Sequence, residues 1–244
     1  ELGARIEGDF HRLQFTPDLL PGDLTGTEIY RPQTGEFNFQ RGPIFHNLLL
    51  ADEINRAPAK VQSALLEAMG EHQVTVGQTT YKLDRPFLVM ATQNPIEQEG
   101  TYPLPEAQLD RFLMHISIDY PAADSEKQIL ALAKEQARLE TGEHSAVNVV
   151  LTKDQIRQAQ NEVLDLHMAE AVEDYLVQLV MASRKPEPYG DDLTGWVNYG
   201  ASPRGTIALD RCARAHAWLQ QRDYVSPEDV QAVIHNVMRH RVLL

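Results

Sequence analysis

The sequence predicts an α/β fold: a parallel sheet with β-hairpin insertions, followed by an all-helical part. Two apolar runs, Leu48–Ala51 and Phe87–Ala91, each end in polar residues. This pattern is typical of strands that are buried on both faces of a parallel sheet. From Asp124 onward, apolar residues recur at helical spacing instead. We therefore expect an α/β domain over residues 1–122 and a helical domain over residues 123–244.

Composition excludes several classes of protein. The chain has 244 residues, 43% of them hydrophobic, which suffices for one large or two modest domains. A formal charge of −13 argues against a generally basic surface that binds nucleic acid, although this net charge does not exclude a local basic pore. No apolar run has the length of a membrane span. There is one cysteine, Cys212, so the chain has no internal disulfide, which suits a reducing cytoplasm. Cys212 lies on an apolar helical face, so we expect a packed thiol.

The segments before the first acidic motif predict a strand and a hairpin. Leu13–Phe15 has the composition of a strand. Glu28–Tyr30 and Glu36–Phe39 flank Thr34-Gly35, which is the pattern of two strands joined by a turn. These elements lead to the buried strand at Leu48–Ala51.

After the acidic motif, the pattern predicts a helix, a second hairpin and two further strands. Apolar residues from Val61 to Met69 recur at helical spacing, and Gly70 is expected to end that helix. Gln73–Leu83 alternates around a Gly-Gln pair, which predicts a hairpin. Glu106–Phe112 is expected to form a short helix, and Leu113–Ile118 a third buried strand.

The second half contains clear helix start signals. Thr152 and Gln155 form a capping-box pair. Ser202-Pro203 and Ser226-Pro227 each place a capping serine before a proline at the first helical position. Residues such as Ile129 and Leu132 define the apolar face of the first helix in this part.

The two carboxylates at the end of the first buried strand are the main candidate site. Ligands of open α/β sheets bind beyond the carboxyl ends of the strands, where Asp52 and Glu53 lie. Asp52 suits a magnesium ion held through water, and Glu53 suits the activation of a water. The alternative is a strand end that two acids keep solvated.

Five motifs together resemble the AAA+ ATPases, and within them the MoxR family. Leu48–Pro58 resembles the Walker B strand, Ala91–Pro95 sensor 1, and Leu104–Phe112 (LPEAQLDRF) the arginine-finger segment. Gly200–Arg204 resembles the sensor 2 motif, and Phe15–Pro21 a segment between Walker A and Walker B. The resemblance covers nearly the whole chain and implies a partial AAA+ core followed by a lid domain.

The resemblance implies roles that side-chain chemistry supports. Asp52 binds Mg²⁺ through water, Glu53 polarises the attacking water, and Asn94 contacts that water or the γ-phosphate of ATP. Arg111 acts on the nucleotide of a neighbouring subunit, and Arg204 contacts phosphate from the first turn of a lid helix. The alternatives are an Asn-Pro turn residue for Asn94, a salt bridge to Asp110 or Glu106 for Arg111, and a solvated side chain for Arg204. Arg56 is a lesser candidate for contacts between subunits.

The sequence contains no GxxxxGK followed by Ser or Thr, the Walker A loop that grips phosphates. We therefore expect a C-terminal portion of a longer protein, which binds nucleotide weakly or not at all without that loop. The resemblance implies, for the complete protein, ATP hydrolysis in a homo-oligomeric, hexameric ring that remodels or activates protein clients. It also implies partners with a von Willebrand factor A domain. The two hairpins resemble insertions of AAA+ relatives that contact substrates near the ring centre; the alternative is exposed β decoration.

Two other functions stay open. The first is a non-catalytic binding or scaffold module that keeps AAA+ surfaces. The second is a nucleic-acid motor, against which the acidic charge and the lack of a basic stretch interleaved with aromatic residues both count.

Overall fold

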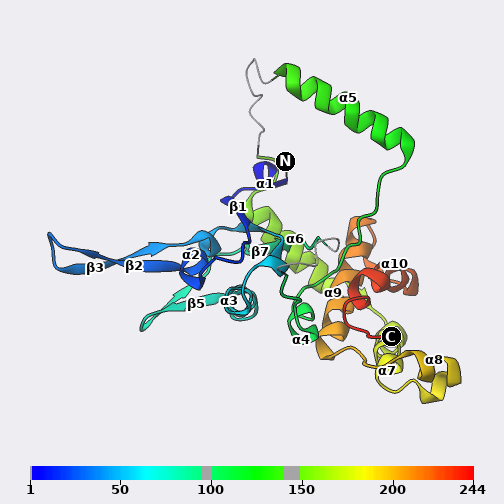
Figure 1. Ribbon diagram of the computed structural model, residues 1–244. Coiled ribbons are helices and arrows are strands. Elements are labelled where there is room, and N and C mark those ends of the chain that lie inside the picture. The colour runs from blue at the N-terminus through cyan, green and yellow to red at the C-terminus, as the bar shows by residue number, and fades with distance from the viewer. Residues whose placement is uncertain (1, 95–100, 140–148) are drawn as a thin grey trace.

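A computed structural model describes residues 2–94, 101–139 and 149–244 (Figure 1). The first part contains α1 (Leu2–Arg5), β1 (Phe10–Gln14), α2 (Pro21–Thr25), β2 (Gly26–Arg31), β3 (Glu36–Arg41), β4 (Leu48–Asp52), α3 (Ala59–Glu71), β5 (Gln73–Val76), β6 (Thr79–Lys82), β7 (Leu88–Ala91) and α4 (Glu106–Leu109). The second part contains α5 (Ala123–Leu139), α6 (Lys153–Asp165), β8 (His167–Met168), α7 (Glu170–Arg184), α8 (Asp191–Trp196), α9 (Pro203–Leu219), β9 (Tyr224–Val225) and α10 (Pro227–Met238). Short 3₁₀ turns lie at Pro43–Phe45, Ile54–Arg56 and Glu187–Tyr189.

The central sheet is parallel and has β4 in the middle, between β1 and β7. Leu49 pairs with His11 on β1 and with Val89 on β7. Leu49 and Ala51 are buried, which confirms the buried strand predicted at Leu48–Ala51. Because the three strands run in the same direction, their carboxyl ends meet at one edge of the sheet.

Both predicted hairpins are present. β2 pairs with β3 and β5 pairs with β6, each antiparallel, and Figure 1 shows both hairpins extending from the same side of the sheet. Phe39 of one hairpin stacks on Tyr81 of the other, with ring centroids 4.3 Å apart. This contact holds the two hairpins against each other near the sheet.

Helix α3 covers the sheet with its apolar stripe, as its periodicity predicted. Val61 and Leu65 are buried in a cluster with Phe15 and Leu49. The helix does not end at Gly70: it continues through Glu71, and His72 takes the left-handed conformation with φ 52° that ends it.

The prediction of a third buried strand at Leu113–Ile118 is wrong. The structure has no strand there, and Ile118 is 90% exposed. A strand requires a neighbouring backbone that accepts and donates its hydrogen bonds. Here the backbone of the segment turns to the helical part instead, since His115 N donates to Asn236 O at 2.8 Å.

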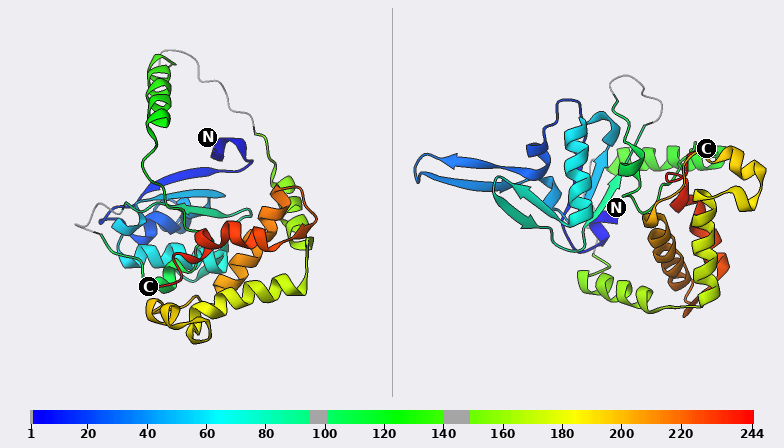
Figure 2. Two further views of the ribbon diagram at one scale, coloured as in Figure 1. Left: turned by 90° about the vertical axis from the view of Figure 1, so that its right-hand side faces the viewer. Right: turned by 90° about the horizontal axis from the view of Figure 1, so that it is seen from below.

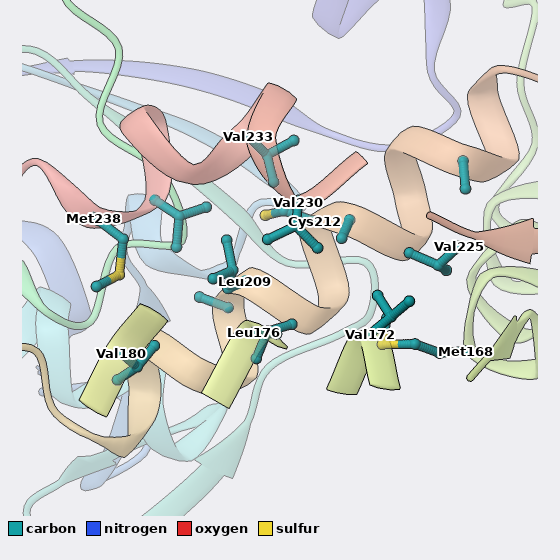
Figure 3. Close-up of a cluster of buried hydrophobic side chains, with 14 of the residues drawn as sticks. Met168, Val172, Leu176, Val180, Leu209, Cys212, Val225, Val230, Val233 and Met238 are labelled. Carbon is teal, nitrogen blue, oxygen red and sulfur yellow. The ribbon is translucent and has the colours of Figure 1, made fainter. Parts of the chain in front are cut away.

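A second apolar cluster lies in the helical part, where α7, α9 and α10 pack together (Figure 3). Leu176, Leu209 and Val230 are buried at its centre. Cys212 is buried in the same cluster, and burial raises the pKa of its thiol to about 11, which confirms a packed thiol.

The predicted helix starts are confirmed, but the environment of α5 differs from the expectation. Thr152 Oγ1 accepts from Gln155 N at 3.2 Å at the start of α6, and Ser202 and Ser226 cap α9 and α10. The apolar face of α5 is exposed at Ile129 and Leu132, and the helix stands apart from the other elements in Figure 1 and in the left view of Figure 2. Among the described residues, no helix combines the length and apolar character that crossing a membrane requires.

Candidate active site

Three strand ends meet where the acidic motif lies. Thr92, which follows β7, donates its N–H to Ala51 O at 3.0 Å, and its own carbonyl accepts from Ile54 N at 3.0 Å. On the other side, Phe15 N donates to Asp52 O at 2.8 Å. The backbone at the end of β4 is therefore held from both neighbouring strands.

Asp52 is held by two side chains from those neighbours. Thr92 Oγ1 donates to Asp52 Oδ1 at 2.5 Å, and Arg12 donates to Oδ2 through Nε at 3.1 Å and Nη2 at 2.5 Å. The hydrogen bond from Thr92, followed by those from Arg12, lowers the pKa of Asp52 below its ordinary value. The carboxylate is therefore ionised at neutral pH, as a cation site requires.

Glu53 has an unusual backbone conformation. Its φ of 56° and ψ of 51° place it in the left-handed region, which costs a residue with a side chain about 1–2 kcal/mol. Glu53 N donates to Thr92 Oγ1 at 2.9 Å, and Glu53 Oε2 accepts from Gln14 at 2.7 Å and from Arg56 at 3.0 Å. Strain that the surroundings maintain in this way is typical of functional sites.

Sequence reasoning missed Arg12 and Gln14. Both lie on one face of β1, because residues two apart on a strand point the same way, and Gln14 pairs in register with Asp52. The signal in the sequence was the alternation of polar residues, Arg12 and Gln14, at the end of a strand. Arg56, a lesser candidate for contacts between subunits, pairs with Glu53 of its own chain, and its role between subunits stays a prediction.

Asn94 leaves the sheet at the same edge, three residues after the end of β7, and is half-buried. Pro95, the last residue of its motif, lies outside the described residues. The role of Asn94 stays a prediction.

Arg111 lies against α3. Its Nη1 donates to Leu66 O at 3.1 Å, and a Cβ on Gly70 would lie 2.5 Å from the same nitrogen, so the absent side chain makes room for the guanidinium. Within the described residues, Arg111 forms an ion pair with neither Asp110 nor Glu106, and no hydrogen bond or ion pair joins it to Asp52 or Glu53. The role of Arg111 at a nucleotide stays a prediction.

Arg204 lies in the first turn of α9, as predicted. Its backbone N–H donates to the capping Ser202 Oγ at 3.0 Å. Its guanidinium is 3.6 Å from Asp110 Oδ2 and its side chain is 54% exposed. The side chain is therefore neither buried nor wholly solvated, and the structure does not bring it to Asp52.

The acidic motif fits a magnesium ion in its donor chemistry. Mg²⁺ in nucleotide sites is held by one or two carboxylates, by phosphate oxygens and by water. Asp52 and Glu53 supply two adjacent carboxylates, and the part of the chain that the structure describes holds no group of three or more acidic, His or Cys side chains suited to a metal ion. The donor chemistry of Asp52 thus fits an ion that phosphate oxygens and water also hold, and it leaves Glu53 available to a water molecule.

Comparisons with known proteins agree with the fold. Residues 1–114 match the family model described as "ATPase family associated with various cellular activities (AAA)", and residues 196–243 match the AAA lid domain. A crystal structure of a protein from Cytophaga hutchinsonii, named provisionally as an ATPase, is 48% identical with a TM-score of 0.90 and covers 100% of this chain and 72% of its own. The fold and the site thus define an AAA+ ATPase class of protein.

Three relatives of known sequence indicate the family within this class. Chaperone MoxR1 of Mycobacterium tuberculosis is 49% identical over 240 residues, which are 98% of this chain and 62% of that protein. The uncharacterized protein YeaC of Bacillus subtilis is 46% identical over 243 residues, which are 100% of this chain and 72% of that protein. Protein MoxR of Paracoccus denitrificans is 35% identical over 257 residues, which are 100% of this chain and 74% of that protein. The chain belongs to the MoxR family of AAA+ ATPases. It spans 62% of the length of MoxR1.

Proposed function

We propose that the complete protein hydrolyses ATP in an oligomeric AAA+ ring, with a hexamer as its form, and uses the energy to remodel or activate protein clients. The observation that carries the proposal is the pair of carboxylates, Asp52 and Glu53, at the carboxyl edge of a parallel sheet. Membership of the MoxR family and the chaperone name of one relative support the class of activity. Partners with a von Willebrand factor A domain and a cytoplasmic location belong to the same proposal.

The proposed roles follow from where each side chain lies. Asp52, kept ionised by Thr92 and Arg12, holds Mg²⁺ through its water shell. Glu53, fixed by Gln14 and Thr92, accepts a hydrogen bond from the attacking water and draws electron density onto its oxygen. When bound, Mg²⁺ neutralises charge on the phosphate oxygens of ATP.

The other three proposed residues act on phosphate from different elements. Asn94, at the edge of the sheet, donates from its amide to the water or the γ-phosphate. Arg204 approaches phosphate from the start of α9, where the helix dipole also favours an anion. Arg111 serves the nucleotide of a neighbouring subunit, which agrees with its lack of a hydrogen bond or ion pair to Asp52 and Glu53 among the described residues. Residues 1–122 then form part of the core, and residues 123–244 form the lid.

Replacing the proposed water-activating acid tests this assignment. In the full-length protein, Glu53→Gln keeps the size of the side chain but removes the charge that polarises water. We expect ATP binding to persist and turnover to be abolished. Glu71→Gln, at the exposed end of α3, is the matched control and should turn over normally. Normal turnover by Glu53→Gln would refute the assignment of Glu53.

A non-catalytic binding module is the second candidate, favoured by the lack of a Walker A motif in these 244 residues. Calorimetry with ATP and Mg²⁺ on the full-length protein separates the two candidates, and the same measurement on this chain tests whether binding needs the Walker A motif. We expect weak or no binding by this chain, because the backbone and lysine that grip phosphates are not in the sequence. Micromolar binding by the 244 residues would contradict that expectation.

A further inference from the structure

Arg241, three residues beyond α10, is a buried arginine in the helical part whose guanidinium binds the core segment. Nε donates to Asp110 Oδ1 at 2.9 Å, and Nη2 donates to Asp110 O at 3.1 Å and to Phe112 O at 2.5 Å. Nη1 donates to Leu113 O at 3.3 Å and to Val237 O in the last turn of α10. The side chain of Arg241 is 2% exposed.

These contacts use the whole donor capacity of the guanidinium. Arginine has five N–H donors in a rigid, planar fork, and here five acceptors face them. Four of the acceptors belong to residues on either side of Arg111, namely Asp110, Phe112 and Leu113. Arg241 therefore fixes the backbone turn that carries Arg111, without touching the Arg111 side chain itself.

The Asp110 carboxylate extends the link to the start of α9. Its Oδ2 accepts from Ser202 Oγ at 2.6 Å and lies 3.6 Å from Arg204 Nη1. Ser202 also caps the helix by accepting from Arg204 N. One buried carboxylate thus joins the turn of Arg111, the residue Arg204 and the end of α10.

Two further contacts hold the same segment against α10 and the residues that follow it. His115 N donates to Asn236 O at 2.8 Å, and His240 Nε2 lies 3.1 Å from Phe112 O. Burial and the charge of Arg241 lower the pKa of His240 to about 4. The ring is therefore neutral at pH 7, and a protonated Nε2 donates to the carbonyl.

We propose that Arg241 is a positioning residue that fixes the turn carrying Arg111 to the lid, so that the presentation of Arg111 to a neighbouring subunit follows the position of α9 and α10. The proposal rests on the proposed function, because it takes Arg111 as the arginine that acts on the neighbour's nucleotide. A saturated buried guanidinium does not slide gradually along its acceptors: losing one partner of a buried pair leaves an uncompensated charge. The turn and the lid therefore move as one unit.

The test compares Arg241→Lys with Arg239→Lys in the full-length protein. Lysine keeps the charge but offers three donors from one nitrogen, which cannot reach acceptors on both sides of the turn. Misplacing a catalytic group by about 1 Å costs on the order of 10²-fold in rate, so we expect kcat to fall by about that factor with little change in the KM for ATP. Arg239 is exposed and donates to His235 O in its own helix, so its variant should keep wild-type kinetics.

Subunit mixing separates positioning of Arg111 from a general structural effect. Arg241→Lys subunits have an intact Glu53, and Glu53→Gln subunits have a correctly held Arg111. Mixed rings should therefore recover turnover that neither variant shows alone, because a Glu53→Gln neighbour presents Arg111 to an Arg241→Lys site. Failure of mixing to restore turnover, when Arg111→Ala subunits are restored in the same assay, would overturn the proposal.

Amide hydrogen exchange tests whether Arg241 anchors the turn of Arg111, independently of ATPase activity. If Arg111→Ala itself leaves kcat unchanged, the proposed role of Arg111 has failed, but the anchoring by Arg241 is still measurable. We expect faster exchange across residues 111–115 in Arg241→Lys than in Arg239→Lys, and equal exchange would overturn the proposal. Should Arg241→Lys not fold, Asp110→Asn is the second variant, because it keeps an oxygen for Arg241 but loses the charge, and it should show the same loss of kcat and faster exchange.

Discussion

Asp229, the third residue of α10, is the best-defined buried charge in the helical part. Its side chain is 0% exposed. Ser226 donates to Oδ2 from its N–H at 2.8 Å and from its hydroxyl at 3.0 Å, and Arg222 Nη1 donates to the same oxygen at 2.8 Å. Oδ1 accepts from Arg222 Nη2 and lies 2.6 Å from His216 Nδ1. The carboxylate thus joins the start of α10 to α9 and to the loop between them.

Replacing Asp229 with alanine removes all of these bonds at once. Breaking a buried ion pair typically costs about 3–5 kcal/mol. Arg222 and His216 keep 28% and 33% of their side-chain surface exposed, so water compensates part of their loss, and we expect the lower end, about 3 kcal/mol. In a protein of this size, 1 kcal/mol corresponds to about 2–4 °C in Tm, so Tm should fall by about 6–12 °C.

The cost should depend on pH in a definite direction. Burial raises the pKa of Asp229, but the hydrogen bonds from Arg222, Ser226 and His216 outweigh it, so the pKa lies below its ordinary value of 3.8. A lowered pKa contributes stability at pH above the value of the unfolded chain, and this stability is lost as the pH falls below it. The difference between wild type and Asp229→Ala should therefore be full at pH 7 and shrink as the pH falls through 3.8.

Thermal unfolding followed by circular dichroism at pH 7 and at pH 3 measures both effects. Glu228→Ala is the matched control, because Glu228 is the exposed acid next to Asp229 in the same first turn. If Asp229→Ala melted within about 2 °C of Glu228→Ala at pH 7, or if the difference grew at pH 3, the reasoning from burial and pairing would be refuted.

Two further predictions concern the core. Thr92→Val removes the hydroxyl that hydrogen-bonds both Asp52 and Glu53. The free energy of unfolding should fall by about 1 kcal/mol, and ATP turnover of the full-length protein should fall about tenfold. Thr92→Ser keeps the hydroxyl and should retain turnover. A Cβ on Gly42 would lie 2.3 Å from Leu24 O, so Gly42→Ala should cost about 1–3 kcal/mol in urea unfolding. A Cβ on Gly195, in α8, would meet nothing within 4 Å, so Gly195→Ala should be at least as stable as wild type.

Much of the fold follows from patterns that lie close together in the chain. The apolar run at Leu48–Ala51, the two alternating hairpins and the helix starts at Thr152, Ser202 and Ser226 all appear where the sequence predicts them. Helical or alternating periodicity and capping depend on residues a few positions apart, so one sequence contains the necessary information. The acidic motif was recognisable for the same reason.

The neighbours of each charged side chain do not follow from such local patterns. Arg12 and Gln14 reach Asp52 and Glu53 across roughly 40 positions of sequence, and Arg241 reaches Asp110 across 131. Which donors meet a carboxylate depends on which distant segments pack together, and periodicity carries no record of that choice.

The segment Leu113–Ile118 shows the same limit in the backbone. Its apolar composition predicts a strand, but strand formation depends on a partner backbone, and His115 N donates to α10 while Leu113 O accepts from Arg241. Local sequence therefore set the type of most elements and the identity of the acids. The packing of distant segments set the pairing of those acids, the environment of Arg111 and the junction between sheet and lid, because the partners of these side chains lie far away in the sequence.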